Sequence, residues 1–205
     1  MAAQLLRRRF TVHEYHRMGQ AGILGEDDRL ELLEGEIVEM APIGSRHQAV
    51  VDRLTRLFSN RAEDAALVRV QGPVRLGEDS EPQPDLLLLA PRADFYASDH
   101  PGPEDVFLLV EVSDTSTEYD REVKLPLYAR YGIAEVWLVG LEAGAVEVYR
   151  APTAQGYQEV SQAGRDQGIS PVAFPQLELA VEDVIGQAPG YTTQDPLRQD
   201  NVPPA

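Results

Sequence analysis

Runs of apolar residues separated by turn-forming residues divide the chain into short strands. Leu86-Leu87-Leu88-Leu89 follows Pro84-Asp85, and residues 106–110 are all apolar before Glu111. Apolar runs of this length, bounded by turn residues, are typical of strands buried on both faces of a sheet. Glu34-Gly35 lies between apolar flanks and predicts a hairpin over residues 30–40. We predict further strands over residues 67–76, 85–89, 106–112, 135–139, 145–149 and 157–160.

Two segments carry helix signals near the start of the chain. Residues 45–62 place apolar side chains on one helical face, and Ser45 is a favourable N-cap. Thr11 and Glu14 have the spacing of a capping box. A first helix is therefore predicted to begin after Thr11 and to end near residues 19–22. The face of the second helix comprises Val50, Val51, Leu54, Leu57 and Phe58.

Residues 117–131 also have a helical pattern, but Pro126 falls inside it, where proline usually breaks a helix. Two alternatives are open. Pro126 interrupts the helix, or it marks the first turn after a loop or turn over residues 119–123. A short last helix is predicted over residues 181–185.

Strands and helices mix without strict alternation, which favours an α/β (α+β) sandwich around one mixed sheet flanked by helices. The length suits one domain, and we place it at residues 10–185. Residues 1–9 are expected to be a flexible N-terminus. Residues 186–205 are rich in Gln, Pro and Thr with little apolar content, so we expect a disordered tail that folding does not need.

Composition narrows the functional classes. The chain has no cysteine, which excludes disulfides, cysteine zinc sites and thiol catalysis and fits a cytoplasmic location. No apolar stretch is long enough to span a bilayer, so no membrane association is expected. The net charge of −16 opposes general nucleic-acid binding. Lys124 is the only lysine, although arginines cluster at residues 7–9 and 46–61 and offer a local basic patch.

Two acids stand beside buried apolar runs, Asp85 before one and Glu111 after another. Such an acid is costly unless it is paired or holds a metal. Taken alone, Asp85 would be a turn or cap residue, and Glu111 would pair with an arginine. Together with the nearby Lys124 they favour a divalent-metal site, because carboxylate oxygens are the ligands that Mg²⁺ prefers. We expect the two carboxylates to converge from adjacent strands.

The ordered set of motifs resembles the PD-(D/E)xK nuclease superfamily and, within it, the Uma-two family, small bacterial proteins described as restriction endonucleases. The resemblance covers roughly residues 10–185. It rests on the segments at residues 29–40, 45–47, 84–85, 111–113, 119–128 and 132–139. The set is specific for the family and less specific for activity, since a protein can keep a fold and its motif after catalytic activity has been lost.

The resemblance implies a restriction-endonuclease-like fold and a DNA endonuclease that depends on Mg²⁺ or Mn²⁺. It implies a metal site at Asp85, Glu111 and Val112. DNA is the expected partner, and a homodimer the expected assembly. Ser113 stands where the superfamily usually has a lysine, so Lys124 is the expected replacement, orienting the attacking water and stabilising phosphoryl charge.

Two further residues are assigned from the same resemblance. The sequence leaves open whether Glu31 or Glu34, three residues on and on the opposite face, is the additional acid. The resemblance favours Glu31 and places Glu34 at the solvated hairpin tip. His47 is a phosphate contact or a base, or else an ordinary cap or surface residue. Asp120 and Lys124 stand four apart and could pair on a helix.

A second interpretation remains open, in which the chain is a catalytically inactive nuclease fold that serves as an interaction or oligomerisation module. The acidic charge and Ser113 favour it. The distance between the Lys124 ammonium and the two carboxylates separates the alternatives. An ammonium more than about two hydrogen-bond lengths from both would remove the catalytic lysine.

Overall fold

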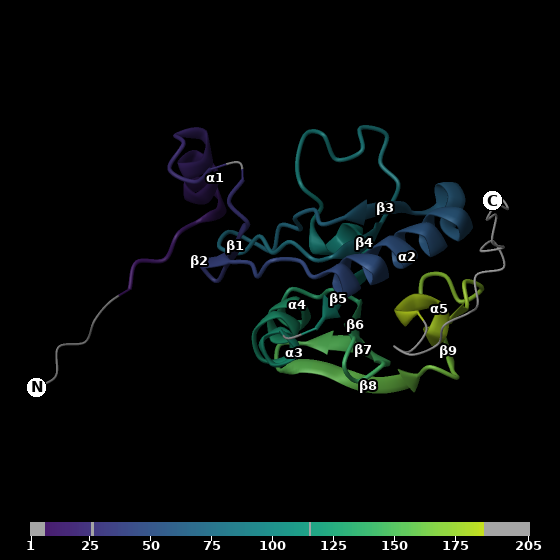
Figure 1. Cartoon of the computed structure of the whole chain (residues 1–205). Helices are drawn as coiled ribbons and strands as arrows, with labels where there is room; N and C mark the ends of the chain where they lie inside the picture. Colours follow the sequence, from purple (N-terminus) through teal and green to yellow (C-terminus); the bar gives the residue numbers. More distant parts are fainter. Residues whose placement is uncertain (1–6, 26, 115, 187–205) are drawn as a thin grey trace, which may run out of the picture.

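A six-stranded mixed sheet forms the centre of the computed structural model, which describes residues 7–25, 27–114 and 116–186 (Figure 1). Its strands are arranged in the order β3-β4-β5-β6-β7-β8. Their bounds are β3 Leu67–Val70, β4 Leu86–Leu89, β5 Val106–Ser113, β6 Glu135–Gly140, β7 Ala145–Thr153 and β8 Gly156–Gly164. Strands β5 and β6 run parallel, and every other neighbouring pair is antiparallel.

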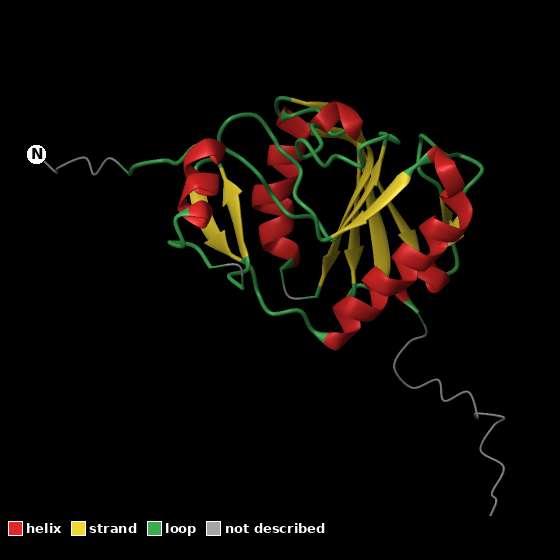
Figure 2. Ribbon diagram, turned by 90° about the horizontal axis from the view of Figure 1, so that it is seen from above, coloured by secondary structure: helices red, strands yellow, loops and turns green. Residues whose placement is uncertain are grey.

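The central strands are buried because helices cover both faces of the sheet (Figure 2). Helices α2 (Ser45–Ala62) and α5 (Val181–Ile185) cover one face, where Leu108 and Val110 of β5 meet Leu54. Helix α4 (Leu125–Arg130) covers the other face, against Leu109. Side chains alternate along a strand, so Glu111 points to the same face as Leu109, towards α4.

A continuous helical crossover joins the parallel strands β5 and β6. It consists of α3 (Thr117–Tyr119), a π-helical turn (η3, Asp120–Lys124) and α4. The wide turn is closed by a hydrogen bond from the Leu125 N–H to the Asp120 carbonyl. Pro126 follows at the start of α4, where its missing N–H breaks no regular helical bond. Pro126 lies in the first turn of α4, as the second alternative predicted, but the segment before it is a π-helical turn that continues the helix and not a loop.

The N-terminal part of the chain packs on the crossover side of the sheet (Figure 2). Helix α1 (Val12–Gln20) begins with the predicted capping box, in which Thr11 and Glu14 bond reciprocally. Strands β1 (Leu30–Leu33) and β2 (Glu36–Glu39) form the predicted antiparallel hairpin. Glu81, in the loop before β4, adds a bridge to Leu32 of β1 and fastens the hairpin to the core.

Several predicted boundaries change. Ser45 is not an N-cap: it is the first residue of α2, and Gly44 precedes it as a cap without a side chain. The strand predicted over 67–76 ends at Val70, because Gln71 has a positive φ of 47°. The remaining elements are η1 Glu63–Ala65, η2 Pro103–Asp105, β9 Gly168–Ile169 and β10 Leu179–Ala180.

Some predictions concern parts of the chain that the structure does not cover. Residues 1–6 of the expected flexible start and residues 187–205 of the expected disordered tail lie outside the described residues. The single domain at 10–185 stays a prediction. Within the described ranges, no helix combines the length and the apolar character that crossing a membrane requires.

Candidate active site

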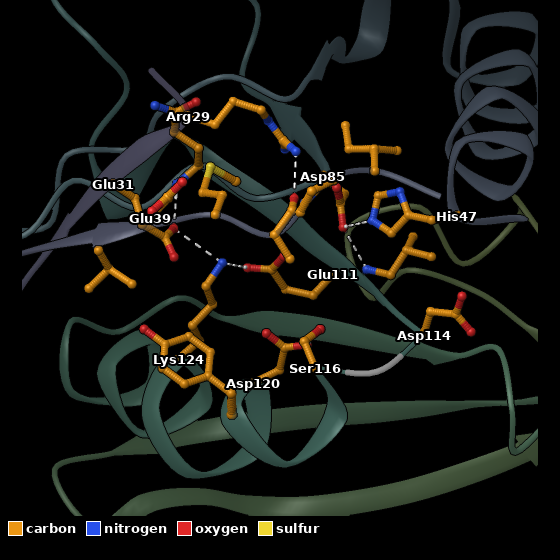
Figure 3. Close-up of a pocket in the computed structure, with 18 of the residues that line it drawn as sticks. Arg29, Glu31, Glu39, His47, Asp85, Glu111, Asp114, Ser116, Asp120 and Lys124 are labelled. Carbon is orange, nitrogen blue, oxygen red and sulfur yellow. Dashed lines mark hydrogen bonds and ion pairs between the residues drawn. The ribbon is translucent and has the colours of Figure 1, made fainter. Parts of the chain in front are cut away.

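A cavity of about 420 Å³ opens where the hairpin, the start of α2, the ends of β4 and β5, and the crossover helix meet (Figure 3). Each structural part contributes one candidate residue. These residues are Glu31 from the hairpin, His47 from α2, Asp85 before β4, Glu111 from β5 and Lys124 from the crossover. The predicted residues, spread over 94 positions of the chain, therefore line one hollow.

Glu111 and Lys124 form a buried pair at the base of this cavity. The Lys124 Nζ lies 3.2 Å from Oε1 of Glu111. The same carboxylate oxygen accepts a hydrogen bond of 2.5 Å from the Tyr128 hydroxyl. Both members of the pair are less than a tenth exposed. The lysine thus satisfies the distance condition that separates the two sequence-based interpretations.

Glu31 is the hairpin acid that enters the cavity. Its Oε2 lies 3.1 Å from the Lys124 Nζ and accepts the main-chain N–H of Gln83 at 3.3 Å. Glu34 lies outside, half exposed at the hairpin tip, where it pairs with Arg130 at 2.7 Å. The two acids point apart because residues three positions apart on a strand face opposite sides.

Asp85 is held at the other side of the cavity. Its Oδ2 accepts the main-chain N–H of Val112 at 2.8 Å and lies 3.0 Å from Nε2 of His47. The main chain of Val112 therefore positions Asp85 beside Glu111, the preceding residue of β5. The Nδ1 atom of His47 is buried and has no hydrogen-bond partner among the described residues.

Acidic residues outnumber basic residues in the cavity, and Glu111 and Lys124 are buried away from water. Burial raises the pKa of Glu111 to about 8; the charge of Lys124 opposes that rise, and Asp85 and Asp120 reinforce it. Burial acts to lower the pKa of Lys124, but Glu111, Glu31 and Asp120 outweigh it and raise that pKa. Lys124 is therefore an ammonium at neutral pH.

The donor set suits a hard divalent cation by charge and by ligand type. Six acidic residues line the cavity, among them Glu31, Asp85 and Glu111, and a cation beside Glu111 would relieve the desolvation that raises its pKa. The oxygens of Glu31, Asp85 and Glu111 do not form a set within 4.8 Å of one another among the described residues. The Lys124 ammonium lies between two of these acids instead.

His47 combines a half-buried position with an acidic partner. The hydrogen bond to Asp85 raises the pKa of His47, and burial opposes that rise. The expectation that His47 is an ordinary cap or surface residue is therefore wrong. A raised pKa favours the imidazolium, which donates hydrogen bonds, over the neutral base.

Sequence reasoning missed one member of the site and gave another the wrong partner. No role at the site was predicted for Tyr128, but its hydroxyl donates a hydrogen bond to Glu111. The signal was its position one turn after Lys124. Asp120 is buried and accepts a hydrogen bond from Ser116 at 2.8 Å. No ion pair within 4.0 Å joins it to Lys124 in the described part of the chain, so the suggested pair does not form.

The arginines of α2 are largely used inside the fold. Arg46 donates to the Leu141 carbonyl, Arg53 to that of Ile185 and Arg61 to that of Glu178. These contacts fix α2 against the carbonyl ends of neighbouring elements. Part of the hydrogen-bonding capacity of these arginines is therefore occupied within the fold, although their charges remain.

Comparison with known proteins places these features in a family context. The model of the family described as "Uma2: Putative restriction endonuclease" matches residues 12–182. No curated protein matches the chain. The family match includes every residue named in the cavity.

A solved structure shares the architecture. A crystal structure from Anabaena variabilis, described as "a putative nuclease belonging to DUF820", superposes with a TM-score of 0.66 at 17% sequence identity. The match covers 86% of this chain and 97% of the other. At that identity the likeness establishes the fold, and it agrees with the predicted restriction-endonuclease-like fold.

Proposed function

The chain belongs to the Uma2 family of restriction-endonuclease-like proteins, as its motifs predicted, and from that premise we propose that it is a divalent-metal-dependent DNA endonuclease. The reaction is hydrolysis of a phosphodiester bond. The oxygen of water forms a bond to phosphorus, and one ester oxygen leaves with a proton.

The observation that carries the proposal is the position of Lys124. The only lysine of the chain is buried, and its Nζ lies 3.1 Å from Glu31 and 3.2 Å from Glu111 in a cavity that also contains Asp85. Because Lys124 is buried, it does not contribute to the solubility of the protein surface. Perturbed ionisable groups gathered in a hollow are typical of catalytic sites.

Asp85, Glu111 and the main chain of Val112 are the proposed ligands of Mg²⁺ or Mn²⁺, with Glu31 as a further acid. When bound, such an ion stabilises charge on phosphoryl oxygen and lowers the pKa of water. Tyr128 holds Glu111 by its hydroxyl, and the Val112 N–H holds Asp85.

Lys124 and His47 supply positive charge rather than bases. The raised pKa of Lys124 keeps it protonated, so it donates hydrogen bonds to water or to a phosphoryl oxygen and cannot remove a proton. His47, whose pKa is also raised, orients Asp85 and is suited to contact a phosphate. Of the two roles that the sequence left open for His47, this favours the phosphate contact.

Nicking of supercoiled plasmid DNA in low salt with Mn²⁺ or Mg²⁺ tests the proposal. We expect cleavage by the parent, loss of most of it in Lys124→Ala, and poor rescue in Lys124→Arg, because a guanidinium is a broad fork and an ammonium a compact charge. Since Lys124 acts on charge that develops in the transition state, its loss should lower the rate more than Mn²⁺ affinity.

Arg121→Ala is the matched control, since Arg121 lies on the same crossover helix and pairs with Glu147 at the surface. It should cleave like the parent. Cleavage by Lys124→Ala at the parental rate, with native circular dichroism, would remove Lys124 from the mechanism.

One observation favours the second candidate, an inactive nuclease fold used as an interaction module. The net charge of −16 opposes contact with DNA, and few arginines of α2 remain free of internal contacts. A parent protein that cleaves no DNA under any of these conditions would support it. The homodimer and the cytoplasmic location stay predictions.

A further inference from the structure

A second cluster of ionisable side chains lies away from the proposed active site. His16 of α1, Glu81 of the loop before β4, and His100 of the loop between β4 and β5 bring one ligand atom each within 4.8 Å of one another. None of these three residues lines the cavity that contains Lys124. The sequence offered no constellation around either histidine, because 65 and 19 positions separate the three residues along the chain.

Glu81 contributes a buried carboxylate to this cluster. Its side chain is 4% exposed, and Oε1 lies 2.7 Å from Nε2 of His16. The other oxygen, Oε2, is buried and has no hydrogen-bond partner among the described residues. A buried carboxylate oxygen without a partner costs free energy, so something is expected to satisfy it.

Main-chain bonds fix Glu81 in this position. Its N–H donates to the Leu32 carbonyl at 2.6 Å, and its carbonyl accepts the Leu32 N–H at 3.4 Å. His16 and His100 are exposed, and their rings approach edge to face with centroids 6.0 Å apart. A rigid buried acid thus faces two movable imidazoles at the surface.

We propose that His16, Glu81 and His100 bind a borderline divalent transition-metal ion of the Zn²⁺ class. Two imidazole nitrogens and one carboxylate oxygen are the ligands such ions prefer, and three protein ligands leave a position for water. Tetrahedral bonds of about 2.0–2.1 Å set ligand atoms about 3.4 Å apart. The present ligand atoms lie within 4.8 Å of one another, so binding would require the two exposed histidine side chains to rotate towards Glu81.

The ion would join three segments that are distant in the sequence. It would tie α1 to the loop that carries the hairpin bridge and to the loop between β4 and β5. The site is structural in this proposal, and it is independent of the nuclease assignment. Arg75 and Asp99 line the same hollow; Arg75 lies 3.6 Å from Glu78, which offsets its charge.

A simple ion pair between His16 and Glu81 is the competing explanation. It accounts for Oε1 of Glu81 but leaves Oε2 without a partner and assigns nothing to His100. The two explanations differ in a measurable way, because only the metal site requires His100.

The test is titration of the full-length protein with Co²⁺, followed by its visible absorption, and with Zn²⁺ by calorimetry. Both titrations contain excess Mg²⁺, which occupies carboxylate sites but competes poorly for imidazole. We expect one ion per chain. His16→Asn and His100→Asn should each weaken Zn²⁺ affinity by at least the roughly 10–100-fold that altered ligand surroundings cost.

His13→Asn is the matched control, because His13 is an exposed histidine on the same helix outside the cluster. It should bind like the parent, as should Asp85→Asn, which changes only the nuclease cavity. Parental affinity in His100→Asn, or no Zn²⁺ binding by the parent in excess Mg²⁺, would overturn the proposal. The parental titration decides the question even if a variant fails to fold.

Discussion

Burial of the Glu111 carboxylate costs stability, whereas the proposed function requires that carboxylate in the cavity. It is buried at the end of an apolar strand, and its negative charge is compensated by Lys124 and by the Tyr128 hydroxyl. A buried ion pair often stabilises less than its desolvation costs. The raised pKa of Glu111 records that imbalance. Such a group is expected where a cation or a substrate completes the site.

Glu111→Gln should therefore stabilise the metal-free protein at alkaline pH. The folded pKa of Glu111, about 8, exceeds the ordinary value of 4.5. Between these values the folded protein holds a proton that the unfolded chain releases, so the free energy of unfolding falls as pH rises. We expect a gain on the order of 1–3 kcal/mol in the variant at about pH 8 that is much smaller at about pH 5.

Urea denaturation in EDTA at the two pH values measures this difference. Lys124 is protonated in both states over that window, since its ordinary value is already 10.5 and the fold raises it. Glu122→Gln is the control, because Glu122 is an exposed acid on the crossover helix. If Glu111→Gln is no more stable relative to the parent at about pH 8 than at about pH 5, burial does not destabilise the ionised form of Glu111.

At the scale of elements, the position of Lys124 depends on one wide helical turn. The π-helical turn Asp120–Lys124 precedes α4, and both Asp120 and Lys124 are buried within it. An inserted residue in a helical turn rotates the side chains on either side, and such turns are common at functional sites. The proline that the sequence pattern flagged as a helix breaker follows this turn directly.

The hairpin is the second element that builds the cavity, and its turn needs glycine. Gly35 has a φ of 77°, and a Cβ there would lie 2.6 Å from the Cβ of Arg9. Gly35→Ala should therefore lower the free energy of unfolding by about 1–2 kcal/mol, because alanine is strained in left-handed backbone. Displacement of the Arg9 side chain should lower it further. Mn²⁺ affinity should fall as well, because the hairpin carries Glu31.

Gly132→Ala provides the control for this substitution. Gly132 has a φ of 79°, but a Cβ there would meet nothing within 4 Å. Denaturation of the two variants separates backbone strain from steric conflict. Equal losses of stability would mean that the contact between the N-terminal segment and the hairpin turn does not constrain the hairpin.

At the scale of the whole molecule, excess acid is the dominant property. The chain carries 34 acidic and 18 basic residues, and six acidic residues line one cavity. Net charge far from zero destabilises the compact state through self-repulsion. Salt that screens this repulsion should therefore raise the melting temperature by a few degrees, since the Debye length shrinks to about 10 Å at 0.1 M.

MgCl₂ should raise the melting temperature more than NaCl at equal ionic strength. Screening is the same in both salts, so the excess reports binding to the native state. Asp85→Asn should abolish the excess and keep the response to NaCl. Identical curves for the two salts in the parent would argue against a divalent site at neutral pH.

Much of the fold followed from the sequence because its signals are local. The apolar runs of β4 and β5, the capping box of α1 and the Glu34-Gly35 turn each act within a few residues, and each forms as predicted. The family could also be predicted from the sequence, because its motifs are an ordered series along the chain. Boundaries such as Val70 and Gly44 were wrong because neighbouring segments, not local propensity, decide where an element ends.

The sequence by itself determined the fold class, the family and the candidate acids with their lysine. Only the tertiary structure decided that Glu31 rather than Glu34 enters the cavity, that Tyr128 bonds to Glu111, and that His16, Glu81 and His100 meet. Spacing along one strand or helix fixes a face, whereas contact between distant segments depends on how the faces pack. Convergence of side chains from three elements is therefore a property of the folded chain alone.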